Sequence, residues 1–111
     1  APYSNPAYVD PEEAFVAAIA SCHMLTFLYV AYRSGIEVTR YEDEAVGVMT
    51  KNEQGKMWVS RVTLDPQIMY AGDKRPTPEQ ETQLHHAAHA DCFIANSVKT
   101  DVVVSGFDHA A

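Results

Sequence analysis

Two thiols, those of Cys22 and Cys92, are the side chains in this sequence best suited to chemistry. They lie too far apart in the chain to form a CxxC redox turn or a zinc knuckle. Two inert core thiols, or one structural disulfide, would give them no part in a reaction. In a reducing compartment, however, a disulfide is more often transient and reactive than permanent. The spacing alone leaves these alternatives open.

Histidines upstream of the second cysteine add two further possibilities. On a helix, His85, His89 and Cys92 would share one face. With Cys22 as a fourth ligand, this set would suit tetrahedral zinc. The same segment would permit a hydrolase in which either cysteine is the nucleophile and His89 and Asp91 complete a triad. No local motif decides between these sites.

Length and charge narrow the class of protein. The 111 residues suffice for one domain with a packed core, and a hydrophobic content of 47% excludes a disordered tail. The net charge is −7, and the sequence contains no block of Lys or Arg. We therefore expect neither nucleic acid nor a membrane as a partner. Residues 1–4 show no signal-peptide pattern, so we expect a cytoplasmic protein.

A long helix is predicted to carry the first cysteine. Asp10 supplies an N-cap, Pro11 suits the first helical position, and Glu13 completes a capping box. Gly35 supplies the stop, which predicts a helix over residues 11–34. Its central part is apolar all round, as in a protein core or a membrane span. Polar residues at mid-length and the lack of basic flanks favour the core.

The remaining elements are predicted to be strands and one more helix. A second helix is predicted to begin with the same capping pattern, with Thr77 as N-cap, Pro78 at the first helical position and Gln80 completing the capping box. It is expected to end near Asp91. Strands are expected over residues 36–41, 44–50, 57–70 with an interruption at 65–66, and 100–104. The sheet is expected to bury one face against the first helix through Val46, Val48, Met57, Val59, Val62 and Leu64. This order predicts an α+β fold.

Two motifs resemble those of a known family. DPEEAFVAAIASCH, residues 10–23, resembles the first cysteine helix of the OsmC/Ohr family, and HADCFIANS, residues 89–97, resembles its second cysteine segment. The similarity runs over about residues 8–104 and includes the loop at 72–76. It implies an OsmC-like α+β fold with a long central helix on a mostly antiparallel sheet, a second helix carrying the second cysteine, and an intertwined homodimer. We expect a single OsmC-like domain over residues 1–111.

The resemblance also implies an activity. A protein of this kind is a thiol-dependent peroxidase that reduces organic hydroperoxides in a stress response, without a cofactor or metal. Cys22 matches the attacking thiolate, which becomes a sulfenic acid, and Cys92 matches the resolving thiol that forms a disulfide with it. A dihydrolipoyl or thioredoxin-like dithiol would reduce that disulfide. Glu12 matches a carboxylate that orients the reactive site together with an arginine. The alternatives are a zinc-binding His/Cys module and a non-catalytic protein of the same fold.

Two departures from the family pattern bear on this activity. Members usually carry strands before the first helix, with the arginine that steadies the thiolate, and this sequence has neither there. Its own arginines do not match that position: Arg33, Arg40, Arg61 and Arg75. Many members have proline after the second cysteine, where this chain has Phe93, which bears on the geometry of the resolving turn.

The position of Glu12 predicts a composite active site. About ten helical residues separate it from Cys22, so the two lie roughly 15 Å apart along the axis. Glu12 then reaches only the Cys22 of a second subunit, across an antiparallel crossing of two such helices. Small side chains would allow a close crossing: Ala14, Ala17, Ala18 and Ser21. Larger residues would line either the core or an apolar substrate pocket: Phe15, Ile19, Met24, Phe27 and Tyr29.

Overall fold

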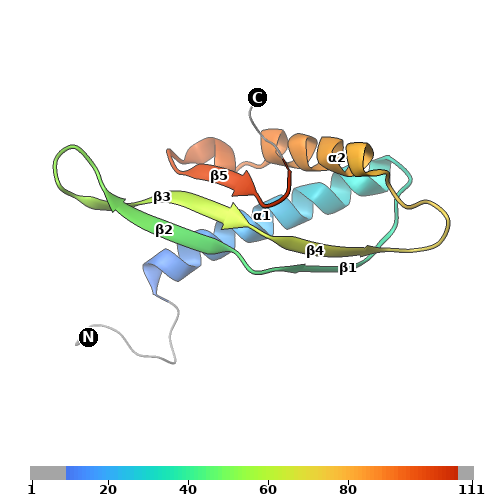
Figure 1. The fold of residues 1–111 in the computed structure, drawn as a ribbon, viewed down its shortest axis with the longest axis horizontal. Coiled ribbons are helices and arrows are strands. Elements are labelled where there is room, and N and C mark those ends of the chain that lie inside the picture. The colour runs from blue at the N-terminus through green and yellow to red at the C-terminus, as the bar shows by residue number, and fades with distance from the viewer. Residues whose placement is uncertain (1–9, 108–111) are drawn as a thin grey trace.

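The computed structural model describes residues 10–107, and α1 (Pro11–Arg33) runs behind two small sheets in the view of Figure 1. The other elements follow in chain order: β1 (Val38–Asp43), β2 (Val46–Lys51), β3 (Met57–Leu64), β4 (Pro66–Tyr70), α2 (Pro78–Asp91), the 3₁₀ helix η1 (Ala95–Ser97) and β5 (Asp101–Val104). α2 lies alongside the C-terminal half of α1 (Figure 1). The α+β prediction is therefore confirmed. Residues 1–9, the part of the sequence before the first helix in which the family's N-terminal strands were expected to be missing, lie outside the described residues.

Both helices begin with the predicted caps. The carboxylate of Asp10 accepts a hydrogen bond from the amide of Glu13 at 2.8 Å. Thr77 and Gln80 form a reciprocal capping box, with each side chain accepting from the other residue's amide at 3.1 and 2.9 Å. These bonds satisfy backbone amides of the first turn that have no partner inside the helix. Because the capping residues lie within three positions of those amides, the sequence predicted where each helix begins.

The C-terminal end of α1 differs by one residue from the prediction. The amides of Gly35 and Ile36 donate to the carbonyls of Tyr32 and Ala31, at 3.0 and 2.9 Å. This is a Schellman motif, which the left-handed φ of 76° at Gly35 permits. The helix therefore ends at Arg33 rather than at residue 34. Because Ile36 belongs to the cap, β1 begins two residues later than expected.

The strands form two separate sheets rather than one. β1 pairs antiparallel with β4, while β2 pairs antiparallel with β3, which pairs in parallel with β5. The segment over residues 57–70 is interrupted at Asp65, as expected, and its two strands belong to different sheets. The division falls at Asp65, whose amide donates to the carboxylate of Asp43 at 2.7 Å. This bond ties the end of β3 to the end of β1.

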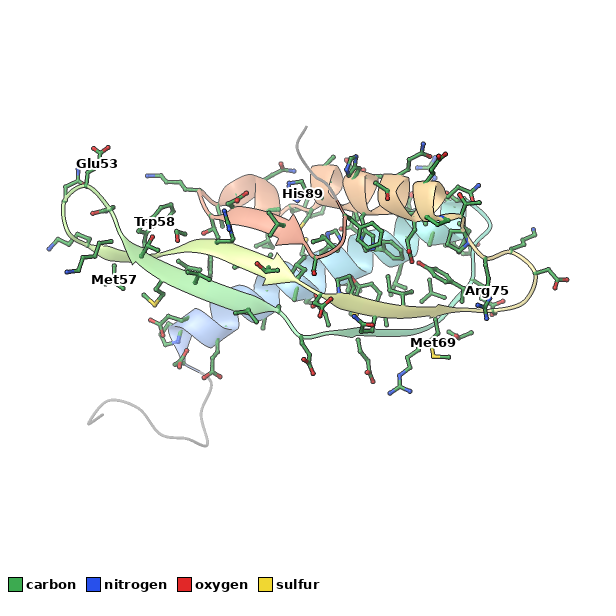
Figure 2. The ribbon with its side chains drawn as sticks, in the orientation of Figure 1. Glu53, Met57, Trp58, Met69, Arg75 and His89 are labelled. Carbon is green, nitrogen blue, oxygen red and sulfur yellow. The ribbon has the colours of Figure 1, made fainter. Side chains whose placement is uncertain are left out.

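The expectation that β2 buries an apolar face is wrong for the described chain. All six residues of β2 are exposed, including Val46 and Val48, and Met57 of β3 is exposed as well. β2 is an edge strand of its sheet, and α1 crosses only part of it. Figure 2 shows Met57 at the end of the β2–β3 hairpin and Met69 on β4 toward the other end of the molecule. Val62 and Leu64, by contrast, are fully buried as expected.

α1 connects two hydrophobic clusters through one stripe of its surface. Its buried residues recur every fourth position: Ile19, His23, Phe27 and Ala31. The first cluster joins Ile19 to β3 and β5, and it consists of Ile19, Val62, Leu64, Val102 and Val104. The second joins α1 to α2, and it consists of Phe27, Ala31, Leu84 and Ala88. Because α1 is held against α2, the position of the Cys22 thiol on α1 is fixed relative to α2.

The opposite side of α1 is apolar and exposed. Leu25, Tyr29 and Tyr32 each show more than half of their surface. By length and composition α1 would suffice to cross a membrane. In this structure α1 packs on both sheets and on α2, and His23 is buried at the contact with α2.

Gly47 of β2 sets how closely α1 approaches the sheet. A Cβ at this position would lie 2.7 Å from a methyl group of Val16. Valine on a helix has one strongly preferred rotamer, so the methyl cannot turn away freely. We expect Gly47→Ala to lower the free energy of unfolding by about 1–3 kcal/mol, measured by urea denaturation.

Val16→Ala provides the matched control for this clash. In the double variant the inserted methyl meets no methyl of Val16, so the cost of Gly47→Ala becomes smaller than in the wild-type background. Equal costs in both backgrounds would show that the contact does not limit the approach of α1.

Candidate active site

The fold brings the two cysteines into contact. Cys22 lies at mid-length of α1 and is partly exposed, while Cys92 is the C-cap residue of α2 and is buried. Both are free thiols, and they lie close enough that each shifts the pKa of the other. The packing of α1 on α2 therefore creates the pair, although the residues are far apart in the sequence.

A tight turn after α2 surrounds the two sulfurs with backbone amides. The amide of Ala95 donates to Sγ of Cys92 at 3.4 Å, and the backbone amides of Ile94 and Phe93 lie where they lower the pKa of Cys22. The amide of Asn96 closes the turn by donating to the Cys92 carbonyl at 3.0 Å. We call the N–H groups of Phe93, Ile94 and Ala95 the amide nest. Such groupings of successive amides favour negative charge.

Two side chains hold the amide nest in place. The amide of Asn96 donates from its side chain to the carbonyl of Ala90 at 2.9 Å, which ties the turn to the last turn of α2. The hydroxyl of Ser97 donates to the carbonyl of Phe93 at 2.7 Å. These two residues belong to the HADCFIANS motif, and the structure gives them a positioning role that sequence reasoning had not assigned.

The surroundings shift the two thiol pKa values in opposite directions. Burial alone would raise the pKa of Cys22, but hydrogen bonds from Cys92, the Ile94 and Phe93 amides, and Thr26 outweigh it and lower that pKa below the usual thiol value. Burial raises the pKa of Cys92 to about 11, and its hydrogen bond to Cys22 adds to this. Cys22 is therefore the thiol that ionises first, and Cys92 retains its proton.

The contribution of Thr26 competes with a second bond. Its hydroxyl donates to the Cys22 carbonyl at 2.8 Å. A hydroxyl has one proton, so Thr26 stabilises the Cys22 thiolate only when that proton leaves the carbonyl. The backbone amides of Ile94 and Phe93, which also lower the pKa of Cys22, have no such alternative orientation.

Cys22 opens onto an apolar groove of about 750 Å³ between α1 and the turn after α2. Its lining, here called the Cys22 groove, is Ala18, Ser21, Cys22, Leu25, Thr26, Tyr29, Ala90, Asp91, Phe93, Ile94 and Asn96. Of the residues predicted for a substrate pocket, only Tyr29 is among them. Ile19 and Phe27 are buried in the core, and Phe15 packs against it. The helical periodicity was the missed signal, since Leu25 and Tyr29 share the face of Cys22.

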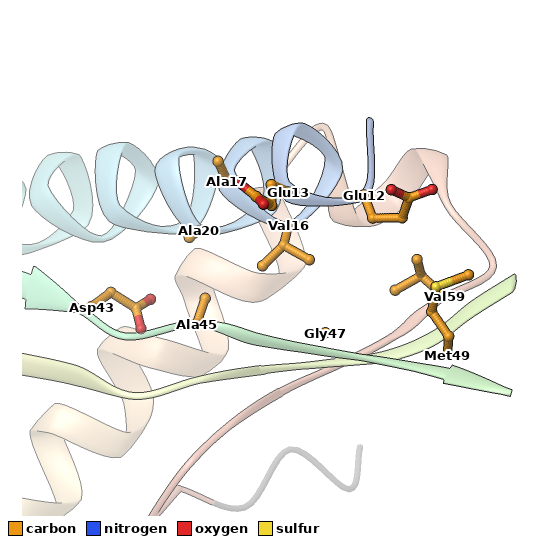
Figure 3. A pocket seen from close by; sticks show the side chains of 10 residues that line it. All are labelled: Glu12, Glu13, Val16, Ala17, Ala20, Asp43, Ala45, Gly47, Met49 and Val59. Carbon is orange, nitrogen blue, oxygen red and sulfur yellow. The ribbon is translucent and has the colours of Figure 1, made fainter. Parts of the chain in front are cut away.

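Glu12 lies away from the thiols of its own chain. It lines a different cavity of about 530 Å³ between α1 and β2, together with Glu13 and Asp43. Figure 3 shows Glu12 and Asp43 toward opposite ends of this cavity, with Gly47 on its floor. The contribution of Glu12 to the reactive site remains a prediction.

The zinc alternative finds no support in residues 10–107. The His85 ring is held by other contacts: its Nδ1 lies 3.0 Å from Nε2 of His23, and its ring packs on Phe27 and Phe107. No group of three or more His, Cys, Asp or Glu side chains in this range is placed to hold a metal. His89 lies on α2 (Figure 2) and Asp91 on the wall of the groove. The groups that lower the pKa of Cys22 are Cys92, the Ile94 and Phe93 amides, and Thr26.

The described arginines lie outside the Cys22 groove. Arg40 pairs with Glu42, and Arg61 lies 3.4 Å from Asp101 on the surface. Arg33 contacts a residue of the groove lining, because its guanidinium stands over the ring of Tyr29, 5.7 Å from the ring centroid. Among residues 10–107, the groups that lower the pKa of Cys22 are all neutral: Cys92, the Ile94 and Phe93 amides, and Thr26.

Comparison with known proteins places the chain in a family. A family model described as OsmC-like protein matches residues 4–105. The chain belongs to the OsmC-like protein family. This membership confirms the resemblance that the two cysteine motifs predicted. No curated protein matches the sequence significantly.

Solved structures agree with the fold of this family member. An OsmC-like protein of unknown function from Vibrio cholerae is 52% identical, with a TM-score of 0.90 over 94% of this chain and 68% of that one. The organic hydroperoxide resistance protein OhrB of Bacillus subtilis is 27% identical, with a TM-score of 0.72 over 86% and 68% of the two chains. A hydroperoxide resistance protein from Elizabethkingia anophelis, 24% identical with a TM-score of 0.71, covers 92% and 71% and supports the fold.

Proposed function

We propose that this protein is a thiol-dependent peroxidase that reduces organic hydroperoxides in a cytoplasmic stress response. The observation that carries the proposal is the contact between a thiol of lowered pKa and one of raised pKa beside an apolar groove. Membership of the OsmC-like family and the likeness to OhrB, a hydroperoxide resistance protein, support it. No resident cofactor or metal is needed for this chemistry.

The first step oxidises Cys22. Its thiolate attacks the terminal oxygen of a hydroperoxide ROOH, the O–O bond breaks, and RO⁻ leaves and takes up a proton as ROH. The sulfur, now oxidised by two electrons, is a sulfenic acid. The apolar lining, above all Leu25, Tyr29 and Phe93, suits an R group that is an alkyl or lipid-like chain.

The second step uses Cys92. Its sulfur attacks the sulfenic sulfur of Cys22, a disulfide forms, and the hydroxyl leaves with the Cys92 proton as water. The raised pKa of Cys92 keeps this thiol protonated until the sulfenic acid appears. A dithiol of the dihydrolipoyl or thioredoxin-like kind then reduces the disulfide and is itself oxidised. Each cycle therefore consumes one hydroperoxide and one dithiol.

We further propose that the active protein is a homodimer in which Glu12 of one subunit reaches the Cys22 of the other. The exposed apolar side of α1 supports this, because a helix face of this kind needs a partner in water. Ala14, Ala17, Ala18 and Ser21 are all exposed and small, so two α1 helices can cross closely there. Glu12 would then orient the reactive site from across the interface.

The decisive experiment is a turnover assay of the whole chain with an alkyl hydroperoxide and a dihydrolipoyl dithiol. We expect hydroperoxide and dithiol to be consumed in equal amounts, and mass spectrometry of the oxidised protein to show one Cys22–Cys92 disulfide. A protein whose thiols remain reduced in the presence of hydroperoxide would be a non-catalytic member of the family.

A further inference from the structure

A hydrogen bond between two buried histidines joins α1 to α2. Nε2 of His23 lies 3.0 Å from Nδ1 of His85, and the two side chains are 1% and 0% exposed. The ring planes differ by only 5°, and the ring centroids lie 5.3 Å apart. Because the nitrogens are so much closer than the centroids, the rings meet end to end in nearly one plane. One ring donates and the other accepts, in the linear geometry that a hydrogen bond prefers.

Aromatic rings hold His85 in this orientation. The centroid of its ring lies 4.5 Å from that of Phe27 on α1 and 4.4 Å from that of Phe107. Phe27 follows His23 by one helical turn, so α1 supplies both a hydrogen-bond partner and a packing surface for the same ring. The hydrogen bond therefore joins rings that packing has already oriented.

The apolar contacts between the two helices have no preferred direction. They are made by Phe27, Ala31, Leu84 and Ala88. Such contacts tolerate a small slide or rotation of one helix on the other, because the hydrophobic effect depends on the area buried and not on an angle. The histidine pair does not tolerate it, since a shift that separates the two nitrogens costs a buried hydrogen bond. The pair therefore specifies one position of α2 on α1.

The two thiols lie beside this contact. Cys22 directly precedes His23 on α1. Cys92 follows His85 by seven residues, about two helical turns, at the end of α2. A disulfide accepts only a narrow range of Cβ separations, about 1 Å wide, so its formation is sensitive to small movements of one helix on the other.

We propose that His23 and His85 are positioning residues: their hydrogen bond sets the register of α2 on α1 and so holds Cys92 where it can bond to Cys22. The inference rests on the proposed peroxidase function only for its consequence in turnover. Neither imidazole lines the Cys22 groove, so we expect neither to contact the hydroperoxide. The step that depends on the pair is the second one, in which Cys92 attacks the sulfenic acid.

Amide side chains can replace the imidazoles, each type at one position only. In histidine, Nδ1 is bonded to Cγ, as the amide nitrogen of asparagine is, whereas Nε2 lies one atom farther out, as in glutamine. Glutamine therefore suits position 23, and asparagine suits position 85. We compare His23→Gln with His23→Asn, and His85→Asn with His85→Gln. Within each comparison the functional group is the same and only its reach differs.

The measurement is the equilibrium between the reduced protein and its Cys22–Cys92 disulfide in mixtures of reduced and oxidised dithiothreitol. The oxidised reagent takes two electrons and two protons from the thiols and becomes a dithiol, so no peroxide enters the assay. Loss of one hydrogen bond makes us expect the equilibrium constant for disulfide formation to fall about tenfold in His23→Asn and His85→Gln. That fall corresponds to about 30 mV in reduction potential.

The variants of matching reach are the rescue. We expect His23→Gln and His85→Asn to retain a disulfide equilibrium within about twofold of the wild type, because each can remake the hydrogen bond. A pair that only stabilised the fold would change the free energy of unfolding and leave this equilibrium alone. Equal equilibrium constants for glutamine and asparagine at either position would overturn the proposal.

Imidazole NMR of the unchanged sequence tests the bond without a substitution. Labelling with ¹⁵N-histidine yields signals from five residues. We expect a scalar coupling, transmitted through the hydrogen bond, between Nε2 of His23 and Nδ1 of His85. The absence of this coupling in the folded, reduced protein would refute the inference even if every variant failed to fold.

The outcomes separate this inference from the proposed function. The disulfide equilibrium and the nitrogen coupling report the geometry of the helix pair whether or not the protein reduces peroxides. The expected difference between glutamine and asparagine, in a protein without turnover, would refute the peroxidase and retain the positioning pair. Turnover with one equilibrium constant for all four variants would do the reverse.

Discussion

We expect Cys22→Ser to abolish the reduction of alkyl hydroperoxides. A serine hydroxyl at this position neither ionises near neutral pH nor forms a sulfenic acid, so the first step is lost. The buried Cys92 cannot replace it, since its pKa is raised to about 11 and it does not line the groove. The measurement is steady-state hydroperoxide consumption with a dithiol. Wild-type turnover by this variant would show that the reaction takes place elsewhere.

Cys92→Ser is the matched variant, and it should fail at a different step. Cys22 still reacts once with a hydroperoxide, but no thiol is in place to form the disulfide. We expect a burst of one equivalent per chain, with a sulfenic acid that dimedone traps and mass spectrometry detects on Cys22. The loss of the Cys92 hydrogen bond also makes us expect a slower burst than in the wild type. Undiminished steady turnover with a thioredoxin-like dithiol would mean that Cys92 is not the resolving thiol.

The second large effect concerns Glu12. We expect Glu12→Ala to lower peroxide reduction about tenfold or more, because the reactive site loses a group that orients it. If Glu12 acts across a dimer, mixing this variant with the inactive Cys22→Ser restores activity. A heterodimer then has one complete site, with Glu12 from one chain and Cys22 from the other. Random exchange of subunits would give about a quarter of the wild-type rate.

Glu79→Ala is the control for this experiment. Glu79 occupies the same helical position in α2 that Glu12 occupies in α1, the residue after the first proline, and both are exposed. Its loss changes charge and helix dipole in the same way, and we expect full activity. A mixture that shows no more activity than Glu12→Ala alone would contradict the composite site. So would a protein that is monomeric at micromolar concentration and fully active.

The helix boundaries are the part of the fold that the sequence predicted best. Asp10 and Thr77 begin the two helices as expected, because a cap bonds to amides within three residues. The end of α1 was off by one, and the start of β1 by two, because the Schellman motif at Gly35 also uses Ile36. Strand burial was predicted correctly for Val62 and Leu64 of β3 but wrongly for β2. Alternation of apolar residues in β2 indicates a strand, but whether a face is covered depends on which element crosses it.

The two cysteines and the helices that carry them were determined by the sequence itself, through motifs and local capping. Only the tertiary structure decided that the two sulfurs lie close together and that their pKa values shift in opposite directions. Their contact requires α1 to pack on α2. Their opposite pKa shifts require a buried environment for Cys92 and, at Cys22, donors from a turn about 70 residues away. Hydrogen bonds within a helix turn are encoded in neighbouring residues. The desolvation of a thiol and the direction of a distant N–H exist only once the chain has folded.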